Sequence, residues 1–288
     1  MIDISLVTVI TNDKERVMEQ LRSVHASQGN FVFEVVISDN GSIDGGPEAI
    51  RKEFPEVQIV ENKMNIGFGA ANNHALPLTK GSYILFLNPD MRLEPDTLIK
   101  MKDWMEAHPT AGIASCRLLD ERGRDNLRAA PRRFPRLFDQ LMVLLKIGKL
   151  FPSTLNGYLY KGFDFSREQD VDSVRGSFML MRREIVEKLG WAFDPRYFIW
   201  FEDVDICREV WRLGYKVVYT PVATAVDYVG QTFKRIKNFY WKQKCMTESM
   251  LRYFRKWEPW YIWIWIAVFR IPVLGAAYFY TKAVFRDR

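Results

Sequence analysis

The chain has 288 residues, 48% of them hydrophobic and 26% charged, so it can bury a large core as one α/β domain or as a domain with an appendage. A formal net charge of +6 favours anionic partners, whether nucleotides, lipid headgroups or nucleic acid. The three widely spaced cysteines include no Cys-x-x-Cys pair, which argues against a disulfide framework or a structural zinc site and favours a reducing compartment.

The first 120 residues alternate strand-length apolar runs with longer helical segments, a pattern typical of a mostly parallel sheet flanked by helices. Strands are predicted near 4–10, 32–38, 57–61, 82–88 and 112–116. Helices are predicted near 13–28, 44–54, 69–79 and 95–107. No basic segment and long apolar stretch open the chain, so no signal peptide is expected and this part should stay in the cytosol.

The pattern changes at 117–136, where seven Arg stand against three acidic residues and two Pro, and we expect an exposed, irregular insertion. An apolar segment at 137–150 is expected to be helical. Further on, the predicted elements are two short strands flanking Gly176 within 171–181, helices at 183–189 and 203–213, and strands near 215–219 and 222–227.

Short polar residues follow the second predicted strand, from Ser38 to Ser42. Ligands of open α/β sheets bind beyond the carboxyl ends of the strands, which places Asp39 where it could hydrogen-bond a base or ribose. The same residues are equally typical of a strand-end turn in which Asp44 caps the next helix. The segment alone does not decide between these interpretations.

A glycine-containing turn at 65–69 opens the third predicted helix. Glycine permits close backbone approach, and a helix N-terminus favours an anion. The turn matches neither the dinucleotide fingerprint Gly-x-Gly-x-x-Gly nor a phosphate-binding P-loop. By itself it is a weak indication of a phosphate site.

The strand near 82–88 ends in Asn88-Pro89-Asp90. Mg²⁺ or Mn²⁺ on a nucleotide diphosphate needs only one or two protein carboxylates, because phosphate oxygens and water complete its octahedron. Asp90 meets that requirement, although Asn-Pro-Asp is also a common turn.

Three carboxylates, those of Glu202, Asp203 and Asp205, follow an aromatic segment and open a predicted helix. The helix dipole stabilises one or two acidic residues in a first turn without any function. Apolar neighbours also raise the pKa of a carboxyl and sharpen a general base, and the surrounding aromatic residues favour this second interpretation.

These segments, in this order and at these separations, resemble glycosyltransferase family 2, a large inverting family with the A-type nucleotide-sugar fold. The resemblance covers about residues 3–232 and includes the opening strand up to Thr11-Asn12 and the stretch from Arg175 to Phe178. Within the family the chain is most similar to rhamnosyltransferase-type enzymes that act on lipid-linked saccharides, because of Asn-Pro-Asp and of Arg-Arg-Phe-Pro at 132–135.

The resemblance implies roles for the matching residues. Asp39 would contact the nucleotide base, Asp90 would bind Mg²⁺ or Mn²⁺, and Asp203 of the Glu202-Asp203 pair would deprotonate the acceptor hydroxyl. The further nucleotide-binding residues would be Thr11, Asn12, Asn40, Asn65, Gly67 and Asn88. The reaction would be a single displacement that inverts the anomeric carbon.

The substrates follow from the same resemblance. We expect L-rhamnose from dTDP-rhamnose as the donor sugar, with a UDP-hexose as the alternative donor. The expected acceptor is a lipid-linked, polyprenyl-diphosphate saccharide used in cell-surface polysaccharide synthesis.

The chain departs from the family pattern at two positions. Asn88 replaces the first carboxylate of the Asp-x-Asp motif, and Asp227 stands where the family often has a metal-binding His. Asp227 either binds the hard cation through oxygen, which would restore the charge lost at Asn88, or is an ordinary strand-end residue.

Arginines in the 117–136 segment offer bidentate contacts to phosphate oxygens, although a run of charge is usually a solvated surface. We expect Arg132 and Arg133 to face the acceptor diphosphate or an anionic lipid. Arg175 and Trp200 are expected on the acceptor side as well.

Residues 233–288 are expected to form a basic and aromatic helical extension of a catalytic domain at 1–232. The segment 233–256 has eight Lys or Arg against Glu248, and Arg270 is the one charge between Trp260 and Tyr280. That apolar stretch either spans a membrane, lies in its interface or packs internally. A central Arg and Pro272 disfavour a clean span, so we expect attachment to the cytoplasmic face of the cell membrane.

Two other classes of protein are weaker alternatives. Basic stripes with aromatic residues also bind nucleic acid, but the acidic cluster at 202–205 would repel it. A nucleotidyltransferase would more typically carry a Gly-rich basic loop directly after the first strand, where this chain has Thr11-Asn12-Asp13. The oligomeric state is not indicated.

Overall fold

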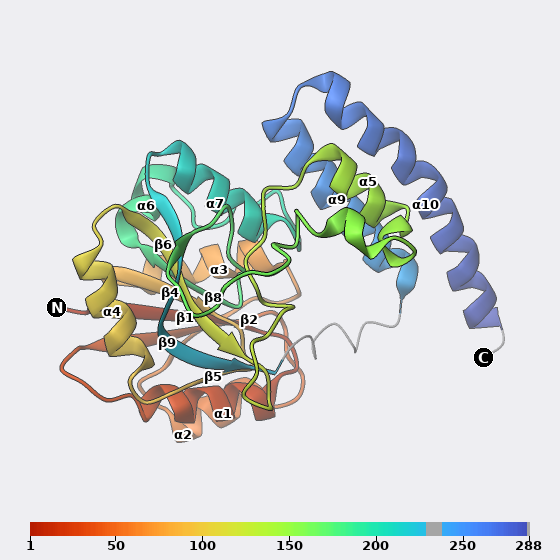
Figure 1. Cartoon of the computed structure of the whole chain (residues 1–288). Coiled ribbons are helices and arrows are strands. Elements are labelled where there is room, and N and C mark those ends of the chain that lie inside the picture. The colour runs from red at the N-terminus through yellow and green to blue at the C-terminus, as the bar shows by residue number, and fades with distance from the viewer. Residues whose placement is uncertain (229–237, 287–288) are drawn as a thin grey trace.

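The computed structural model of the protein describes residues 1–228 and 238–286. Its centre is a nine-stranded sheet with helices on both faces (Figure 1). The strands are β1 (Ile4–Ile10), β2 (Phe33–Asp39), β3 (Gln58–Glu61), β4 (Tyr83–Leu87), β5 (Met91–Leu93), β6 (Ala111–Leu119), β7 (Gln169–Asp170), β8 (Phe178–Arg182) and β9 (Lys216–Asp227). The helices are α1 (Lys14–His25), α2 (Gly46–Glu53), α3 (Phe68–Ala75), α4 (Thr97–Ala107), α5 (Leu137–Leu144), α6 (Arg183–Leu189), α7 (Glu202–Arg212), α9 (Phe239–Trp257) and α10 (Trp260–Arg286).

The strand order is β3-β2-β1-β4-β8-β6-β9-β5, and β7 pairs with β9. The pairs among β3, β2, β1 and β4 are parallel, as is β6 with β9, whereas β5, β7 and β8 run antiparallel to their neighbours. The expectation of an α/β fold with a sheet flanked by helices is therefore confirmed, but the sheet is mixed, with four parallel and four antiparallel pairings rather than mostly parallel ones.

Two predictions, each of two separate strands, were wrong. Within 171–181 only β8 is a strand, and the residues before Gly176 contribute a single bridge between Ser173 and Arg132. Conversely, the two strands expected at 215–227 form the one strand β9, which runs through Pro221. Proline has no N–H to donate to the neighbouring strand. Around Pro221 the pairing of β9 with β6 therefore shifts register, but it does not stop.

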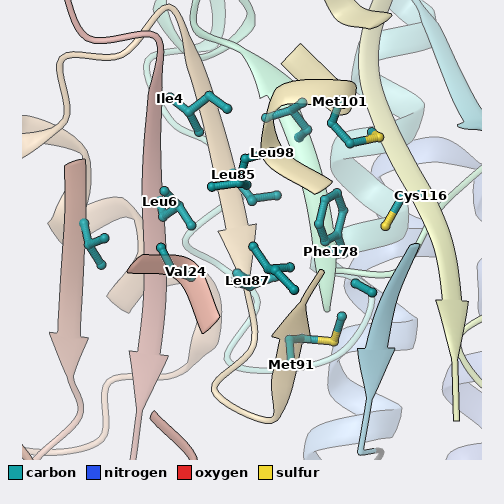
Figure 2. Close-up of a cluster of buried hydrophobic side chains, with 14 of the residues drawn as sticks. Ile4, Leu6, Val24, Leu85, Leu87, Met91, Leu98, Met101, Cys116 and Phe178 are labelled. Atoms are coloured by element: carbon teal, nitrogen blue, oxygen red, sulfur yellow. The ribbon is translucent and has the colours of Figure 1, made fainter. Parts of the chain in front are cut away.

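Side chains that alternate along the strands build a separate core on each face of the sheet. Figure 2 shows one of them, in which Leu6, Leu85 and Phe178 meet Val24 of α1 and Met101 of α4. The other face buries the neighbouring positions, including Val7, Ile84 and Phe86, under α3, α6 and α7. Together the two cores fix the carboxyl ends of the strands. Asn88 directly follows β4, and Asp227 is the last residue of β9.

Helices α9 and α10 pack on each other and, with α5, stand beside the sheet rather than on either face of it (Figure 1). A third apolar cluster joins Met250 and Phe254 of α9 and Ile266 of α10 to Tyr197 and Val204 next to the start of α7. The expected domain boundary at 232/233 lies outside the described residues and stays a prediction. Helix α10 is continuous through Pro272.

Candidate active site

A cavity of about 580 Å³ opens at the carboxyl ends of β4 and β9. Its walls come from the β4–β5 turn, the loop at 128–132, α5, the residues 175–177 before β8, the residues 199–204 at the start of α7, and α9. It therefore brings together the Asn-Pro-Asp and Glu-Asp motifs, which lie more than a hundred positions apart in the chain.

This cavity is lined by polar atoms that lack a partner. Across the residues that the structure describes, five buried side-chain polar atoms make no hydrogen bond, and three of them belong to lining residues. These are Gln140 Nε2, Ser177 Oγ and Glu202 Oε2. Folded proteins rarely leave such atoms without a partner, so the cavity is prepared for a polar ligand.

Asp203 is held at the mouth of the cavity by a tight local backbone. Trp200 and Phe201 have φ values of 66° and 70°, a left-handed conformation that turns the chain sharply into α7. The Asp203 carboxylate accepts a hydrogen bond of 3.4 Å from the Gly176 amide and lies 3.8 Å from Arg175 Nη1. Its side chain remains 14% exposed, so it can meet a substrate hydroxyl.

Glu202, next to Asp203, is buried. Burial, followed by the negative charge of Asp203, raises the pKa of the Glu202 carboxyl well above its usual 4.5. The carboxyl therefore retains its proton to a higher pH than a surface glutamate would. In that form it can donate a hydrogen bond to an oxygen in the cavity, a different task from that of a base.

Asp90 and Asp227 are brought together by the short strand β5. Asp227 pairs with Met91 in the antiparallel β5–β9 ladder, and the Tyr228 amide donates to the Asp90 carbonyl at 3.1 Å. Both carboxylates are buried and line the cavity. No cluster of three His, Cys, Asp or Glu that could hold a metal occurs in residues 1–228 and 238–286. Two carboxylates nevertheless fit a Mg²⁺ or Mn²⁺ whose other ligands are phosphate oxygens and water.

Among the expected nucleotide-binding residues, Asn88 lines the cavity, whereas the others form a hydrogen-bonded cluster beyond β1 and β2. Asp39 accepts from the Ser42 amide, and Asn12 accepts from the Ile43 amide. Asn40 donates to Asn65 Oδ1 and to the Gly67 carbonyl, and Thr11 donates from its amide to Asp13. The turn interpretation thus explains Asp39 locally.

Gly67 is required by a close contact. Its φ is +95°, and a Cβ there would lie 2.5 Å from the carbonyl oxygen of Phe198. The Phe68 amide donates to that same oxygen at 2.8 Å. The glycine turn therefore supports the loop that carries Trp200 into the cavity.

The four residues expected on the acceptor side differ in placement. Arg175 and Trp200 line the cavity, as does Arg132. The Arg132 guanidinium, however, donates to the carbonyls of Leu127, Arg128, Ala130 and Pro131, so it clasps its own loop. Burial and then the charge of Arg175 lower its pKa to about 10.

Arg133 does not line the cavity. Its guanidinium lies 4.7 Å from the centre of the Tyr160 ring, a cation–π contact. The segment 117–136 is also not simply an exposed insertion, since Ala130 is buried and Arg128 lines the cavity. Arg128, an exposed residue, was missed because a run of arginines does not indicate which one lies at the cavity.

Further lining residues carry no motif and were also missed. They are Gln140, Val143, Tyr158, Met246 and Met250. Two of these lie on α9, in the segment whose basic and aromatic composition suggested a membrane surface alone. Only the packing of α9 against α5 and α7 reveals that it closes the cavity.

A buried charge network ties α9 to α7. Lys256 Nζ lies 2.6 Å from Asp205 Oδ2, 2.8 Å from Glu209 Oε1 and 3.2 Å from Asp194 Oδ2. Trp257 Nε1 donates to Asp205 Oδ1 at 2.6 Å. Asp205, the third carboxylate of the acidic cluster, is therefore neutralised from the C-terminal side and does not face the cavity.

Comparison with known families matches residues 5–190 to the model described as glycosyl transferase family 2. Among curated proteins, an N-acetylglucosaminyl-diphospho-decaprenol L-rhamnosyltransferase of Mycobacterium tuberculosis is 27% identical over 214 residues, which cover 70% of this chain and 68% of that protein. The rhamnosyltransferase WbbL of Escherichia coli is 29% identical over 195 residues, which cover 65% of this chain and 70% of that protein.

Solved structures share the fold. A mannosyltransferase of Pyrobaculum calidifontis in complex with GDP-Man and Mn²⁺ superposes with a TM-score of 0.58 at 20% identity, over 97% of this chain and 75% of that one. Staphylococcus aureus TarS in complex with UDP superposes with a TM-score of 0.56 at 16% identity, over 87% of this chain and 66% of that one.

Proposed function

The chain belongs to glycosyltransferase family 2, and from this membership we propose that it transfers L-rhamnose from dTDP-rhamnose to a polyprenyl-diphosphate saccharide with inversion. The similarity to two rhamnosyltransferases, one of them named for a diphospho-decaprenol acceptor, supports the sugar and the lipid. The single observation that carries the proposal is the cavity that Asp203 lines together with Asn88 and Asp90. Membership in this family argues against the two alternative classes, a nucleic-acid-binding protein and a nucleotidyltransferase.

In this mechanism Asp203 accepts the proton of the acceptor hydroxyl as its oxygen attacks the anomeric carbon. The nearby Gly176 amide and Arg175 keep one carboxylate oxygen oriented. Glu202, which retains its proton, is suited to donate to a sugar oxygen. Arg175 also supplies positive charge beside the departing or incoming phosphates.

A panel of nucleotide sugars tests the donor. We expect dTDP-rhamnose to raise the unfolding temperature most and to support transfer to a polyprenyl-diphosphate N-acetylglucosamine, measured by mass spectrometry, because a ligand that binds the native state stabilises it. A UDP-hexose that protects and reacts better would replace the donor assignment. The absence of transfer from every donor in the panel would contradict the acceptor.

We propose that Asp90 and Asp227 hold a Mg²⁺ or Mn²⁺ on the donor diphosphate. Bound there, the cation would offset the charge of the departing nucleoside diphosphate. Asp227→Ala is expected to weaken Mn²⁺ binding in the presence of dTDP by at least about tenfold, the lower end of what even an outer-shell partner contributes. Isothermal titration measures this. Asp96→Ala, which removes a surface carboxylate paired with Lys100, is the control. Unchanged Mn²⁺ affinity in Asp227→Ala would remove Asp227 from the site.

We also propose that α10 attaches the enzyme to the cytoplasmic face of the membrane and lies in its plane. By length and composition Trp260–Ala283 could cross a membrane, and only 11% of its most apolar window is buried. A crossing would carry the neighbouring α9 with it, because α9 packs along α10. Helix α9 bears several Lys and Arg, each of which costs roughly 2.5–3.5 kcal/mol at the bilayer centre. An in-plane orientation leaves them at the headgroups.

Alkaline carbonate extraction tests this orientation. We expect the protein to be released from membranes by carbonate, since peripheral attachment does not survive it. Val268→Glu, on the exposed apolar side of α10, should reduce the membrane-bound fraction, whereas Met64→Glu, at an exposed position of the catalytic domain, should not. Retention in the carbonate pellet would contradict the in-plane orientation.

A further inference from the structure

The cavity has two chemically different ends. Asn88, Asp90 and Asp227 belong to the end at the sheet, which the donor diphosphate and cation occupy in the proposed function. The other end is formed by α5 and α9, and its side chains include Val143, Met246 and others that no step of the reaction uses. The apolar side chains at this end do not suit a nucleotide, and they favour a ligand that carries a hydrocarbon part.

Polar donors also line the cavity near α5. Gln140 is 2% exposed, and within the described part of the chain its Nε2 makes no hydrogen bond of normal geometry, although it lies beside the Tyr158 hydroxyl. The Tyr158 hydroxyl and Arg175 lie beside it, and burial raises the pKa of Tyr158, so this hydroxyl keeps its proton and can donate. Together with Arg128 these groups present N–H and O–H donors to one space, which suits phosphate oxygens.

The apolar end lies in the layer of the molecule that carries the proposed membrane surface. Helices α5, α9 and α10 stand next to one another outside the sheet (Figure 1), and α10 packs on both of the others. The outward side of α10 exposes Trp265, Val268, Ile271 and Phe279. A lipid that extends from the cavity between these helices would therefore emerge next to an apolar surface.

We propose that the α5–α9 end of the cavity is a prenyl-diphosphate subsite, in which Gln140, Tyr158 and Arg175 bind the acceptor diphosphate. Val143, Met246 and Met250 then receive the first isoprene unit. Methionine side chains are flexible and polarisable and adapt to a branched, unsaturated chain. The inference deepens the proposed function, because it rests on an acceptor that is a lipid diphosphate, and it makes α9 part of acceptor recognition.

The test compares farnesyl diphosphate with inorganic diphosphate as ligands of the full-length protein, by isothermal titration in one detergent. We expect farnesyl diphosphate to bind at least about tenfold more tightly, since one buried isoprene unit removes enough apolar surface from water for that gain. The double variant Val143→Gln/Met246→Gln should lose this difference and keep its affinity for inorganic diphosphate. Gln140→Leu should weaken both ligands equally.

The matched control is Met142→Gln/Cys245→Gln. These residues precede Val143 and Met246 on the same two helices, are likewise partly buried, and do not line the cavity. The control should keep the full preference for farnesyl diphosphate. An unchanged preference in Val143→Gln/Met246→Gln would overturn the subsite. An equal loss of the preference in both double variants would also overturn it, because the prenyl group would then bind to a general apolar surface.

Failure of the subsite and failure of the proposed function are distinguishable. If no nucleotide sugar supports transfer while the binding preference responds as expected, the reaction assignment is wrong and the subsite stands. If transfer to a polyprenyl-diphosphate sugar is normal while the preference is absent or insensitive to the double variant, the subsite alone is wrong.

Discussion

Asp203→Asn is expected to lower kcat by about 10²–10⁴, the usual contribution of a general base. Asparagine has the shape of aspartate and can still accept from the Gly176 amide, so the start of α7 should keep its geometry. It cannot take the acceptor proton. Donor binding, measured as protection against thermal unfolding, should change little, because the Asn88–Asp90 end of the cavity is untouched.

The control for this substitution is Asp170→Asn, which removes a carboxylate that pairs with Lys216 at the surface, 2.8 Å away. It should leave kcat within about twofold, because a surface pair contributes little. Near-normal turnover of Asp203→Asn would refute the assignment of Asp203 as base. A loss of donor protection together with kcat would instead indicate that the site had collapsed.

Lys256→Met is expected to destabilise the protein by about 3–5 kcal/mol, the cost of removing one partner from a buried ion pair. Methionine fills nearly the same volume but leaves Asp205, which is 0% exposed, without its cation, whereas Asp194 and Glu209 keep their pairs with Arg196 and Arg212. A loss of this size is a large part of the total stability of a typical domain. Urea unfolding followed by tryptophan fluorescence measures it.

The deficit should grow with pH. Burial already raises the pKa of Asp205 above its ordinary 3.8, although Lys256 and Trp257 oppose the shift. Without Lys256 the pKa rises further. A carboxyl with a raised pKa in the folded state favours folding at low pH and loses that advantage as the pH climbs, so the difference from the unmodified protein should be larger at about pH 8 than at about pH 5.

Two variants separate this network from ordinary surface charge. Lys100→Met breaks an exposed pair with Asp96 and should cost at most about 1 kcal/mol. Lys256→Met/Asp205→Asn should recover part of the loss, since one uncompensated charge is removed. A cost of Lys256→Met no greater than that of Lys100→Met would contradict the network.

The sequence predicted the catalytic half of the fold closely, because there the chemistry sits on regular elements. The apolar run at 83–87 made β4 recognisable, so Asn88 and Asp90 were placed at a strand end. The aromatic residues before Glu202 predicted a carboxyl in an apolar environment, and burial raises the pKa of Glu202, the neighbour of the residue expected to act as the base. The alternation of strands and helices and the turn residues between them are local features of the sequence, and they were sufficient to place these motifs.

What the sequence did not predict depends on contacts between distant segments. Lys256 and Asp205 are 51 positions apart, and among the basic residues of the C-terminal segment nothing marked Lys256 as turned inward. Arg132 and Arg133 are neighbours, yet one clasps its loop and the other stacks on Tyr160. Side-chain direction in an irregular loop follows from tertiary packing, which the local pattern does not contain.

The Lys256 network has a practical consequence for anyone who wishes to shorten the chain. A protein cut before α9 would lose the cation that pairs with the buried Asp205 as well as Met246 and Met250, so it should fold poorly rather than become a soluble enzyme. Glu258 pairs with Arg208 of α7 at 3.0 Å. A truncated protein should therefore end no earlier than Glu258. The apolar residues of α9 that α10 covers should then be replaced by polar ones.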